Sequence, residues 1–333
     1  MNRMSPLRLL VVGCGVHANE TLVPAIASLG RARIVGFCDL NQDRANSAAH
    51  RFSVMRAGTS PIGMIDELRP DAVILAGPPS MHVDVALYAL HAGSHVLVEK
   101  PPATTTGELR RLAAATEASS LIGMVAHNLR YTAAWRKTVA RTPLARVESI
   151  TIEYHASGPI GERWGLLPHE AFLLSHAVHV FDLLNFVLGP SVMAKHHVKS
   201  VGDGRFVLLT QWHSQRDVVG VAVVSTCAPR FDWNVQLATA DGCLARITSP
   251  SEVTFQDLQS DDLGVSGWRH TWRTRSLEAG YDSAGYGAEL MHFFDCIDGV
   301  GVASPSFTEE LAVYQALDEL YRQTGLARST SDD

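Results

Sequence analysis

The sequence predicts an α/β protein built from two domains. Residues 1–125 are expected to form a doubly wound parallel sheet, and residues 126–333 an α+β domain with a large, mainly antiparallel open sheet. Two patterns predict this division. Continuous apolar runs alternate with helical segments in the first third of the chain, whereas later strands alternate apolar and polar residues. The length of 333 residues also suggests two domains, at about 150 residues each.

The first third of the chain repeats a strand–helix unit. Strands that are apolar over their whole length are buried on both faces, which is typical of a parallel sheet covered by helices. Strands are expected at residues 9–12, 34–38, 72–75, 95–98 and 121–125. Helices are expected at residues 19–28, 42–52, 82–92 and 106–118. This order predicts the doubly wound arrangement.

The rest of the chain changes to a period of two. Ile150, Ile152 and Tyr154 alternate with polar side chains along one strand. Further strands are expected at residues 206–213, 218–226, 233–238, 244–248 and 253–256, mostly without helices between them. Helices are expected at residues 169–188, 284–297 and 309–323. This pattern predicts an antiparallel sheet with one face wetter than the other.

The composition excludes several classes of protein. With 46% apolar residues the chain can bury a large core, which excludes intrinsic disorder. A net charge of −6 disfavours binding to nucleic acid. No uninterrupted run of 18 apolar residues is present, so no membrane span is expected. The charged fraction of 19% lies below the ~25% of average soluble proteins and hints at an extra buried surface, such as a subunit interface.

Cysteine usage indicates a reducing compartment. The five cysteines are an odd number without a C-x-x-C pair, and Cys14 and Cys38 lie in or beside apolar runs, where a thiol packs as a small hydrophobe. The apolar run before Cys14 covers only residues 9–12, which is too short for a signal-peptide core of about 7–15 residues. The sequence therefore predicts a cytoplasmic protein.

A dinucleotide-binding fingerprint follows the first predicted strand. Gly13-Cys14-Gly15-Val16-His17-Ala18 fits G-x-G-x-x-G/A, in which the glycines allow a tight turn and a close approach of pyrophosphate. Asp39 ends the next strand, 21 residues after Ala18, at the spacing of a carboxylate that binds the adenosine ribose. This acid favours NAD over NADP, although Arg44 could soften the preference. The alternative is a structural turn followed by a surface aspartate.

A charged pair ends another buried strand. Glu99 and Lys100 follow the apolar run at residues 95–98, at the carboxyl edge where open α/β sheets bind ligands. The alternative is an exposed strand end with no role in binding. The segment alone does not separate the two interpretations.

Together these motifs resemble the glucose–fructose oxidoreductase / inositol dehydrogenase / MocA (Gfo/Idh/MocA) family. The resemblance covers about residues 8–325 and weakens through 190–280. It is carried by Gly13–Ala18, Asp39, Pro78-Pro79-Ser80-Met81-His82, Glu99-Lys100-Pro101, His127-Asn128-Leu129-Arg130 and His179-Val180-Phe181-Asp182. It implies an N-terminal Rossmann NAD(P)-binding domain and a substrate-binding and oligomerisation domain. It also implies hydride transfer to or from a sugar or cyclitol.

The resemblance also assigns site residues. Lys100 would lie beside the nicotinamide and the reacting oxygen, where an ammonium stabilises an alkoxide and passes a proton. The bond before Pro101 is a candidate for a cis peptide. The cofactor-binding residues would be Gly13, Gly15, Val16, His17, Ala18, Asp39, Pro78, Pro79, His82, Glu99, Lys100 and Asn128.

The second catalytic candidate is His179, which matches the family histidine that moves the proton of the reacting hydroxyl. Residues 175, 179, 182 and 186 share one face of the predicted helix. Many relatives carry an aspartate four residues before this histidine, whereas the chain has Ser175. A serine supplies no negative charge to the histidine. The substrate or the direction of reaction therefore differs, or catalysis has been lost.

The sequence gives weaker support for a functional role of several other residues. His169, His176 and His179 invite a metal interpretation, but no zinc-type cysteine pair or H-E-x-x-H motif accompanies them, and no metal is predicted. Trp164, His169, Ser175 and Tyr286 are candidates for contact with the substrate, beside Lys100 and His179. A core or surface role is the alternative for each of the four.

Three functions remain open at this point. The first is an NAD(P)-dependent dehydrogenase or ketoreductase acting on a sugar, nucleotide-linked sugar or cyclitol. The second is a reductase of an imine or another biosynthetic ring, and the third is a non-catalytic NAD(P)-binding regulator. The expected partners are a small-molecule substrate and further copies of the chain, as a homodimer or homotetramer through the second-domain sheet. The sequence does not identify the substrate.

Overall fold

The computed structural model describes residues 5–157, 163–189, 191–202, 204–261, 264–275 and 280–324. The chain forms two compact units. Among the described residues, the first comprises 5–127 with Tyr286–Tyr314, and the second comprises the described part of Asn128–Gly285 with 315–324. The predicted domain boundary after residue 125 is therefore incomplete, because Tyr286–Tyr314 also belong to the first unit. This segment returns because helix α10 (Tyr286–Ile297) packs on α1 (Val23–Leu29) and buries Leu290, Phe293 and Phe294.

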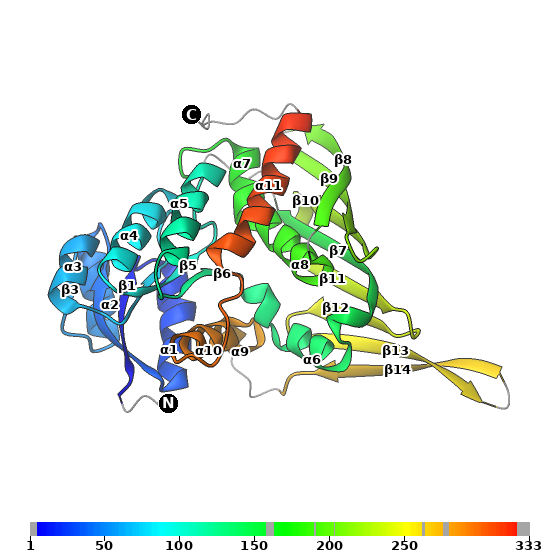
Figure 1. Cartoon of the computed structure of the whole chain (residues 1–333), viewed down its shortest axis with the longest axis horizontal. Coiled ribbons are helices and arrows are strands. Elements are labelled where there is room, and N and C mark those ends of the chain that lie inside the picture. The colour runs from blue at the N-terminus through cyan, green and yellow to red at the C-terminus, as the bar shows by residue number, and fades with distance from the viewer. Residues whose placement is uncertain are drawn as a thin grey trace. The chain divides into compact units, whose positions relative to one another are not determined.

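The first unit contains a six-stranded sheet in which every paired strand is parallel, as predicted (Figure 1). Its strand order is β3-β2-β1-β4-β5-β6, that of a dinucleotide-binding sheet. The strands are β1 Leu7–Val12, β2 Ala32–Cys38, β3 Ala57–Gly58, β4 Ala72–Leu75, β5 His95–Glu99 and β6 Gly123–Ala126. All four residues of β4 and of β6 are buried, which is why these strands are apolar throughout.

Helices flank this sheet, with α3, α4 and α5 packed in sequence and α1 against α10. Their starts carry capping signals: Asn41 caps α2, Ser60 caps α3, and Thr105 and Glu108 form a capping box on α5. The further bounds are α2 Gln42–Arg51, α3 Pro61–Leu68, α4 Pro79–His91, α5 Thr106–Glu117 and α11 Phe307–Thr324, with a π-helical turn η1 at Ala18–Leu22.

The second unit contains an eight-stranded sheet of order β14-β13-β12-β11-β7-β10-β9-β8. Its strands are β7 Val147–Ser157, β8 Ser191–Gly202, β9 Arg205–Ser214, β10 Val219–Ser225, β11 Cys227–Thr239, β12 Leu244–Ser249, β13 Glu252–Asp261 and β14 Gly264–Arg273. Only the pair β7–β10 is parallel among the pairings described, so the predicted antiparallel character is confirmed. The alternation in β7 is also confirmed, since Ile150, Ile152 and Tyr154 are buried.

Helices cover one face of this sheet (Figure 1). Helix α8 packs on β7, β9 and β10, and helix α6 packs on β12 and β13. These and the short elements of the unit are η2 Asn128–Tyr131, α6 Ala133–Arg141, η3 Leu144–Arg146, α7 Pro168–Phe172, η4 Leu173–Ala177, α8 Val178–Leu188 and α9 Gly280–Ser283.

The segment Pro168–Leu188 is long and apolar enough to cross a membrane by length and composition alone. Its apolar window is 83% buried inside the fold, so it is a core helix of the second unit. The expected helix at residues 169–188 is therefore present, but it is interrupted by the π-helical turn η4 at Leu173–Ala177.

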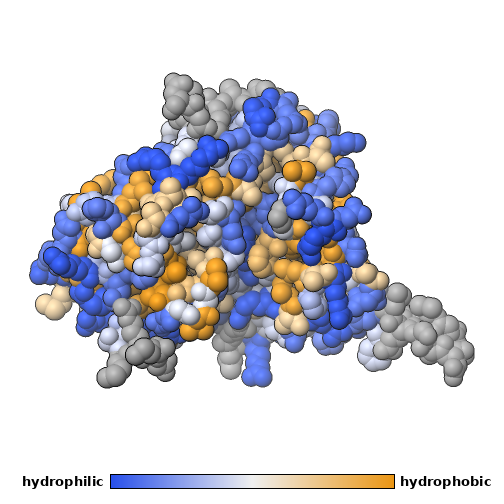
Figure 2. Space-filling view, viewed as in Figure 1, coloured by the Kyte–Doolittle hydropathy of each residue, from blue (hydrophilic) through white to orange (hydrophobic). Residues whose placement is uncertain are grey.

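The opposite face of the eight-stranded sheet is less covered. Trp212 packs against Phe181 of α8, so residues in register with Trp212 lie on the helical face. Leu209 pairs with Val223 on the other face, and Leu209 is 44% exposed. By the same register this face carries Val192, Leu209, Val219, Val221 and Val223. Elsewhere, hydrophobic and hydrophilic residues are mixed on the face shown in Figure 2.

Candidate active site

The loop after β1 lies where the strand order of the first sheet reverses, between β1 and β4. Gly13 has a φ of 99°, and a Cβ built on it would lie 2.6 Å from the carbonyl carbon and oxygen of Ala76. Its N–H donates to the carbonyl of Cys38 at 2.8 Å. Only glycine therefore fits at this position, and the loop packs closely against the segment that follows β4.

Gly15 faces open space, since a Cβ built there would meet no heavy atom within 4 Å. The side-chain amide of Asn19 donates to the carbonyl oxygens of Cys14 and Gly15, at 2.8 and 3.1 Å, and holds the loop in place. The N–H groups that begin the following helix are the usual donors to pyrophosphate in such loops. This combination of an open glycine and a fixed loop fits a dinucleotide.

The Asp39 carboxylate is held by two backbone donors. The N–H of Cys14 donates to one carboxylate oxygen at 2.8 Å, and the N–H of Asn41 donates to the other at 2.9 Å. Asn41 in turn caps α2 by accepting from the N–H groups of Asp43 and Arg44. The carboxylate therefore has a fixed direction at the end of β2, and each oxygen keeps a further lone pair for a ribose hydroxyl.

Strand β5 ends at Glu99, Lys100 follows it directly, and the bond from Lys100 to Pro101 is cis, as expected. The ring N–H at Nε2 of His17 donates to Oε1 of Glu99 at 2.9 Å. The ring of Tyr286 meets the ring of His17 edge-on, with centroids 5.2 Å apart. The structure of the first unit thus brings together residues of the dinucleotide loop, the end of β5 and the start of α10.

The Glu99 carboxyl lies in a buried, charged environment. Burial alone would raise its pKa, but the hydrogen bond from His17 and the charges of His17, Lys100 and His82 outweigh that effect and lower the pKa below its ordinary value. Glu99 is therefore a carboxylate at neutral pH.

His82 supports the turn at Pro101. Its side chain is fully buried on α4, and the N–H at Nδ1 donates to the carbonyl oxygen of Pro101 at 3.0 Å. Burial lowers the pKa of His82 to about 4, so the ring is neutral at pH 7. Pro78 and Pro79 form the start of the same helix as its N-cap and first residue.

In the second unit, Ser175 lies in the π-helical turn and His179 lies in the first turn of α8. The Ser175 hydroxyl donates to the carbonyl oxygen of Ala171, one turn earlier. A π-helical turn frees backbone carbonyls from their regular partners, and a serine hydroxyl can satisfy one of them. The Ser175 side chain therefore bonds to the helix backbone.

Asp182 forms a buried ion pair with Arg130. The guanidinium donates from Nε at 2.8 Å and from its terminal nitrogen at 2.5 Å, one bond to each carboxylate oxygen. The guanidinium also lies 4.5 Å from the ring centroid of Phe186. This two-bond geometry ties η2 to the helix that carries His179.

The other predicted residues lie as follows. His176 bonds through Nδ1 to the hydroxyl of Tyr154 at 2.9 Å and stacks on Phe172. The Asn128 side-chain amide donates to the carbonyl of Ala284 at 2.9 Å. Trp164 has a positive φ of 60°. His169 lies on α7, and Tyr286 begins α10. Sequence reasoning missed Asn19 and Asn41; only Asn41, just before the helix expected at residues 42–52, carries a capping signal.

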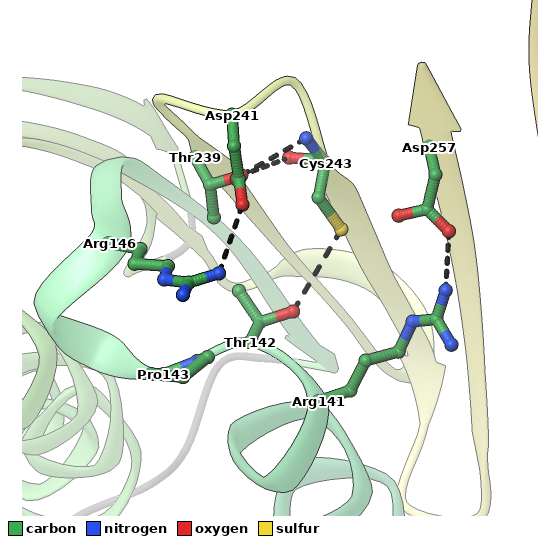
Figure 3. Close-up of a pocket in the computed structure, with 8 residues that line it drawn as sticks. All are labelled: Arg141, Thr142, Pro143, Arg146, Thr239, Asp241, Cys243 and Asp257. Carbon is green, nitrogen blue, oxygen red and sulfur yellow. Dashed lines mark hydrogen bonds and ion pairs between the residues drawn. The ribbon is translucent and has the colours of Figure 1, made fainter. Parts of the chain in front are cut away.

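A polar cavity of ≈ 170 Å³ in the second unit lies between α6–η3 and the strands β11–β13 (Figure 3). Its charged side chains pair with one another, Arg141 with Asp257 and Arg146 with Asp241. Burial and Asp257 raise the pKa of the Cys243 thiol there, so the thiol is not activated. These ion pairs join the α6–η3 segment to the sheet. Because each arginine is paired with an aspartate, the cavity has no net charge that would attract a charged ligand.

Comparisons with known proteins identify the class. A family model described as "Oxidoreductase family, NAD-binding Rossmann fold" matches residues 7–127, which cover the loop after β1 and the end of β5. The first unit is therefore the NAD-binding Rossmann domain of an oxidoreductase family. The predicted resemblance is confirmed for residues 7–127, which match the model of the Gfo/Idh/MocA family.

Relatives and solved structures agree with this assignment. D-glucoside 3-dehydrogenase of Escherichia coli is 26% identical over 60% of this chain and 59% of its own length. Inositol 2-dehydrogenase of Ralstonia nicotianae is 22% identical over 95% of this chain and 93% of its own. The crystal structure of a dehydrogenase from Chromobacterium violaceum has a TM-score of 0.90 at 25% identity and covers 96% of both chains.

Proposed function

We propose that the protein is an NAD-dependent dehydrogenase or reductase that interconverts a hydroxyl and a carbonyl carbon on a sugar, a nucleotide-linked sugar or a cyclitol. The observation that supports this most is the combination of Lys100, after the buried Glu99, with His179 on the core helix of the second unit. Neither residue type is demanded by the fold. The glucoside and inositol dehydrogenases among the relatives support the class of substrate.

Lys100 and His179 would handle the proton. The nicotinamide, when bound, accepts the hydride from a carbinol carbon or returns it to a carbonyl carbon. In the oxidative direction the hydroxyl proton passes to the His179 imidazole, and the Lys100 ammonium stabilises the alkoxide as it forms. Ser175 supplies no negative charge to His179, because its side chain is a neutral hydroxyl, which donates to the Ala171 carbonyl. We expect a weaker base than in relatives with the aspartate, and a preference for carbonyl reduction.

Asp39 is proposed to select NAD over NADP. Its carboxylate is fixed by the N–H groups of Cys14 and Asn41, so it cannot turn aside for a 2′-phosphate. Replacement by alanine is expected to weaken NAD binding about tenfold and to leave NADP binding unchanged or stronger, because one charge repulsion is lost. Calorimetric titration of each cofactor measures both constants. Equal weakening of the two would contradict the ribose assignment.

The substrate class is tested by a panel of sugars, nucleotide-linked sugars and cyclitols, with their keto forms, assayed with NAD(H) and NADP(H) by nicotinamide absorbance. Turnover with any member supports the proposal. A reductase of a cyclic imine is the second candidate, and the absence of the carboxylate at Ser175 favours it, so imines belong in the panel. Cofactor binding without any turnover would instead indicate the non-catalytic regulator.

We further propose that the protein is a cytoplasmic homo-oligomer that associates through the uncovered face of the eight-stranded sheet. That face carries Val192, Leu209 and Val223, and by the same register also Lys195, Lys199 and Glu153. Leu209→Lys is expected to reduce the mass measured by light scattering to that of a smaller assembly, because a charge would be buried in the contact. Met55→Lys in the first unit is the control. An unchanged mass in Leu209→Lys would exclude this face.

A further inference from the structure

The contact between His17 and Glu99 joins two parts of the first unit with different tasks. His17 belongs to the loop after β1, and Glu99 is the residue before Lys100 at the end of β5. Nε2 of His17 lies 2.9 Å from Oε1 of Glu99, and the two side chains are 40% and 11% exposed. A residue of the dinucleotide loop, His17, is thus hydrogen-bonded to Glu99, and Glu99 directly precedes Lys100 in the chain.

Three described side chains act electrostatically on the Glu99 carboxylate. The groups that act on it are His17, Lys100 and His82, and the Tyr286 ring packs on His17 from α10. His82 stays neutral at pH 7 and already donates its Nδ1–H to Pro101. The negative charge of Glu99 is therefore divided mainly between the imidazole of His17 and the ammonium of Lys100.

These two partners compete. A buried carboxylate that is hydrogen-bonded to one donor stabilises a second cation less than a carboxylate with that cation alone. Because His17 is part of the dinucleotide loop, whatever moves this loop changes the share of negative charge that Lys100 receives. The affinity of the Lys100 amine for its proton would then depend on the position of the dinucleotide loop.

We propose that His17 is a positioning residue that withholds the Glu99 carboxylate from Lys100, so that the cofactor loop sets how tightly the lysine holds its proton. The inference rests on the proposed function in giving Lys100 a proton-transfer role. Its test needs no substrate, so the two can fail separately.

The test is a titration of Lys100 itself. Reductive methylation with ¹³C-formaldehyde labels the lysines, and the chain offers only four, Lys100, Lys137, Lys195 and Lys199. The Lys100→Arg variant identifies the signal of Lys100. In His17→Ala the signal is expected to titrate about 0.5–1 pH unit higher than in the unchanged protein, because the Glu99 charge is then no longer shared with His17. The other lysine signals should not move.

Two further variants separate this role from packing. His17→Phe keeps a ring against Tyr286 but removes the N–H, and it is expected to show the same upward shift. His17→Gln restores an N–H donor and should reverse at least half of the shift. His91→Ala, which removes an exposed histidine at the end of α4, is the matched control. Circular dichroism checks that each variant is folded.

An unchanged or lower midpoint for Lys100 in both His17→Ala and His17→Phe would overturn the inference. A shift in His17→Ala alone would also overturn it, because loss of packing would then be the cause. With a substrate from the panel, the alkaline limb of kcat should move upward with the Lys100 midpoint in both variants. Absence of turnover with every compound of the panel would contradict the proposed function. The titration of Lys100 would still test the role of His17, because it needs no substrate.

Discussion

Replacement of Lys100 by alanine is expected to lower kcat by about 10²- to 10⁴-fold, the usual contribution of a positioned acid or base. NADH binding should change by less than about threefold, because the main cofactor contacts are proposed to come from the loop after β1 and from Asp39, which is held by Cys14 and Asn41. Steady-state kinetics with a substrate from the panel gives kcat, and NADH fluorescence gives the dissociation constant.

The control for Lys100→Ala is Lys137→Ala, which removes an exposed lysine of α6 in the second unit. This variant should keep the kcat of the unchanged protein. Full activity in Lys100→Ala would remove the lysine from the mechanism. A loss of NADH binding equal to the loss of kcat would instead make it a cofactor ligand.

Replacement of Asp182 by alanine is expected to lower the free energy of unfolding of the second unit by about 3–5 kcal/mol, since it breaks a buried ion pair. The change leaves the buried Arg130 guanidinium without the carboxylate that accepts two of its hydrogen bonds. Tryptophan fluorescence during urea unfolding measures this unit specifically, because all 6 tryptophans lie within Asn128–Gly285.

Two variants sharpen the test of Asp182. Arg130→Met combined with Asp182→Leu removes both charges and should recover most of the lost stability. Asp241→Ala removes an exposed partner of Arg146 and should cost less than about 1 kcal/mol. A similar small loss in Asp182→Ala would show that the Arg130 pair contributes little to stability.

The central parallel strands of the first unit could be predicted because burial on both faces makes them apolar throughout. The central strands of the second sheet could be predicted because only one of their faces is buried, so that Ile150 and Ile152 alternate with polar residues. Helix α3 was not predicted, since it is short and contains Gly63. Strands β8 and β14 were not predicted either. The side chains of β8 are exposed or half-buried, so no buried alternation marks the strand.

For the candidate active site, the sequence motifs predicted which residues are involved but not which side chains contact one another. The G-x-G-x-x-A loop and Asp39 could be predicted, because glycine conformation and strand spacing are written in local sequence. The contact of His17 with Glu99 and Tyr286 could not, because it joins residues 82 and 269 positions apart. The π-helical turn around Ser175 depends on packing of the helix and leaves no local signal. Its effect, a serine bonded to the backbone, was therefore visible only in the structure.

The return of Tyr286–Tyr314 to the first unit has a consequence for the order of folding during synthesis. A ribosome that has released Met1–His127 has not yet made α10, which packs on α1. The nascent first unit would expose the surface of α1 until almost the entire chain has emerged, whereas the long sheet of the second unit is complete earlier. The cofactor-binding unit begins the chain, yet it is among the last parts to be finished.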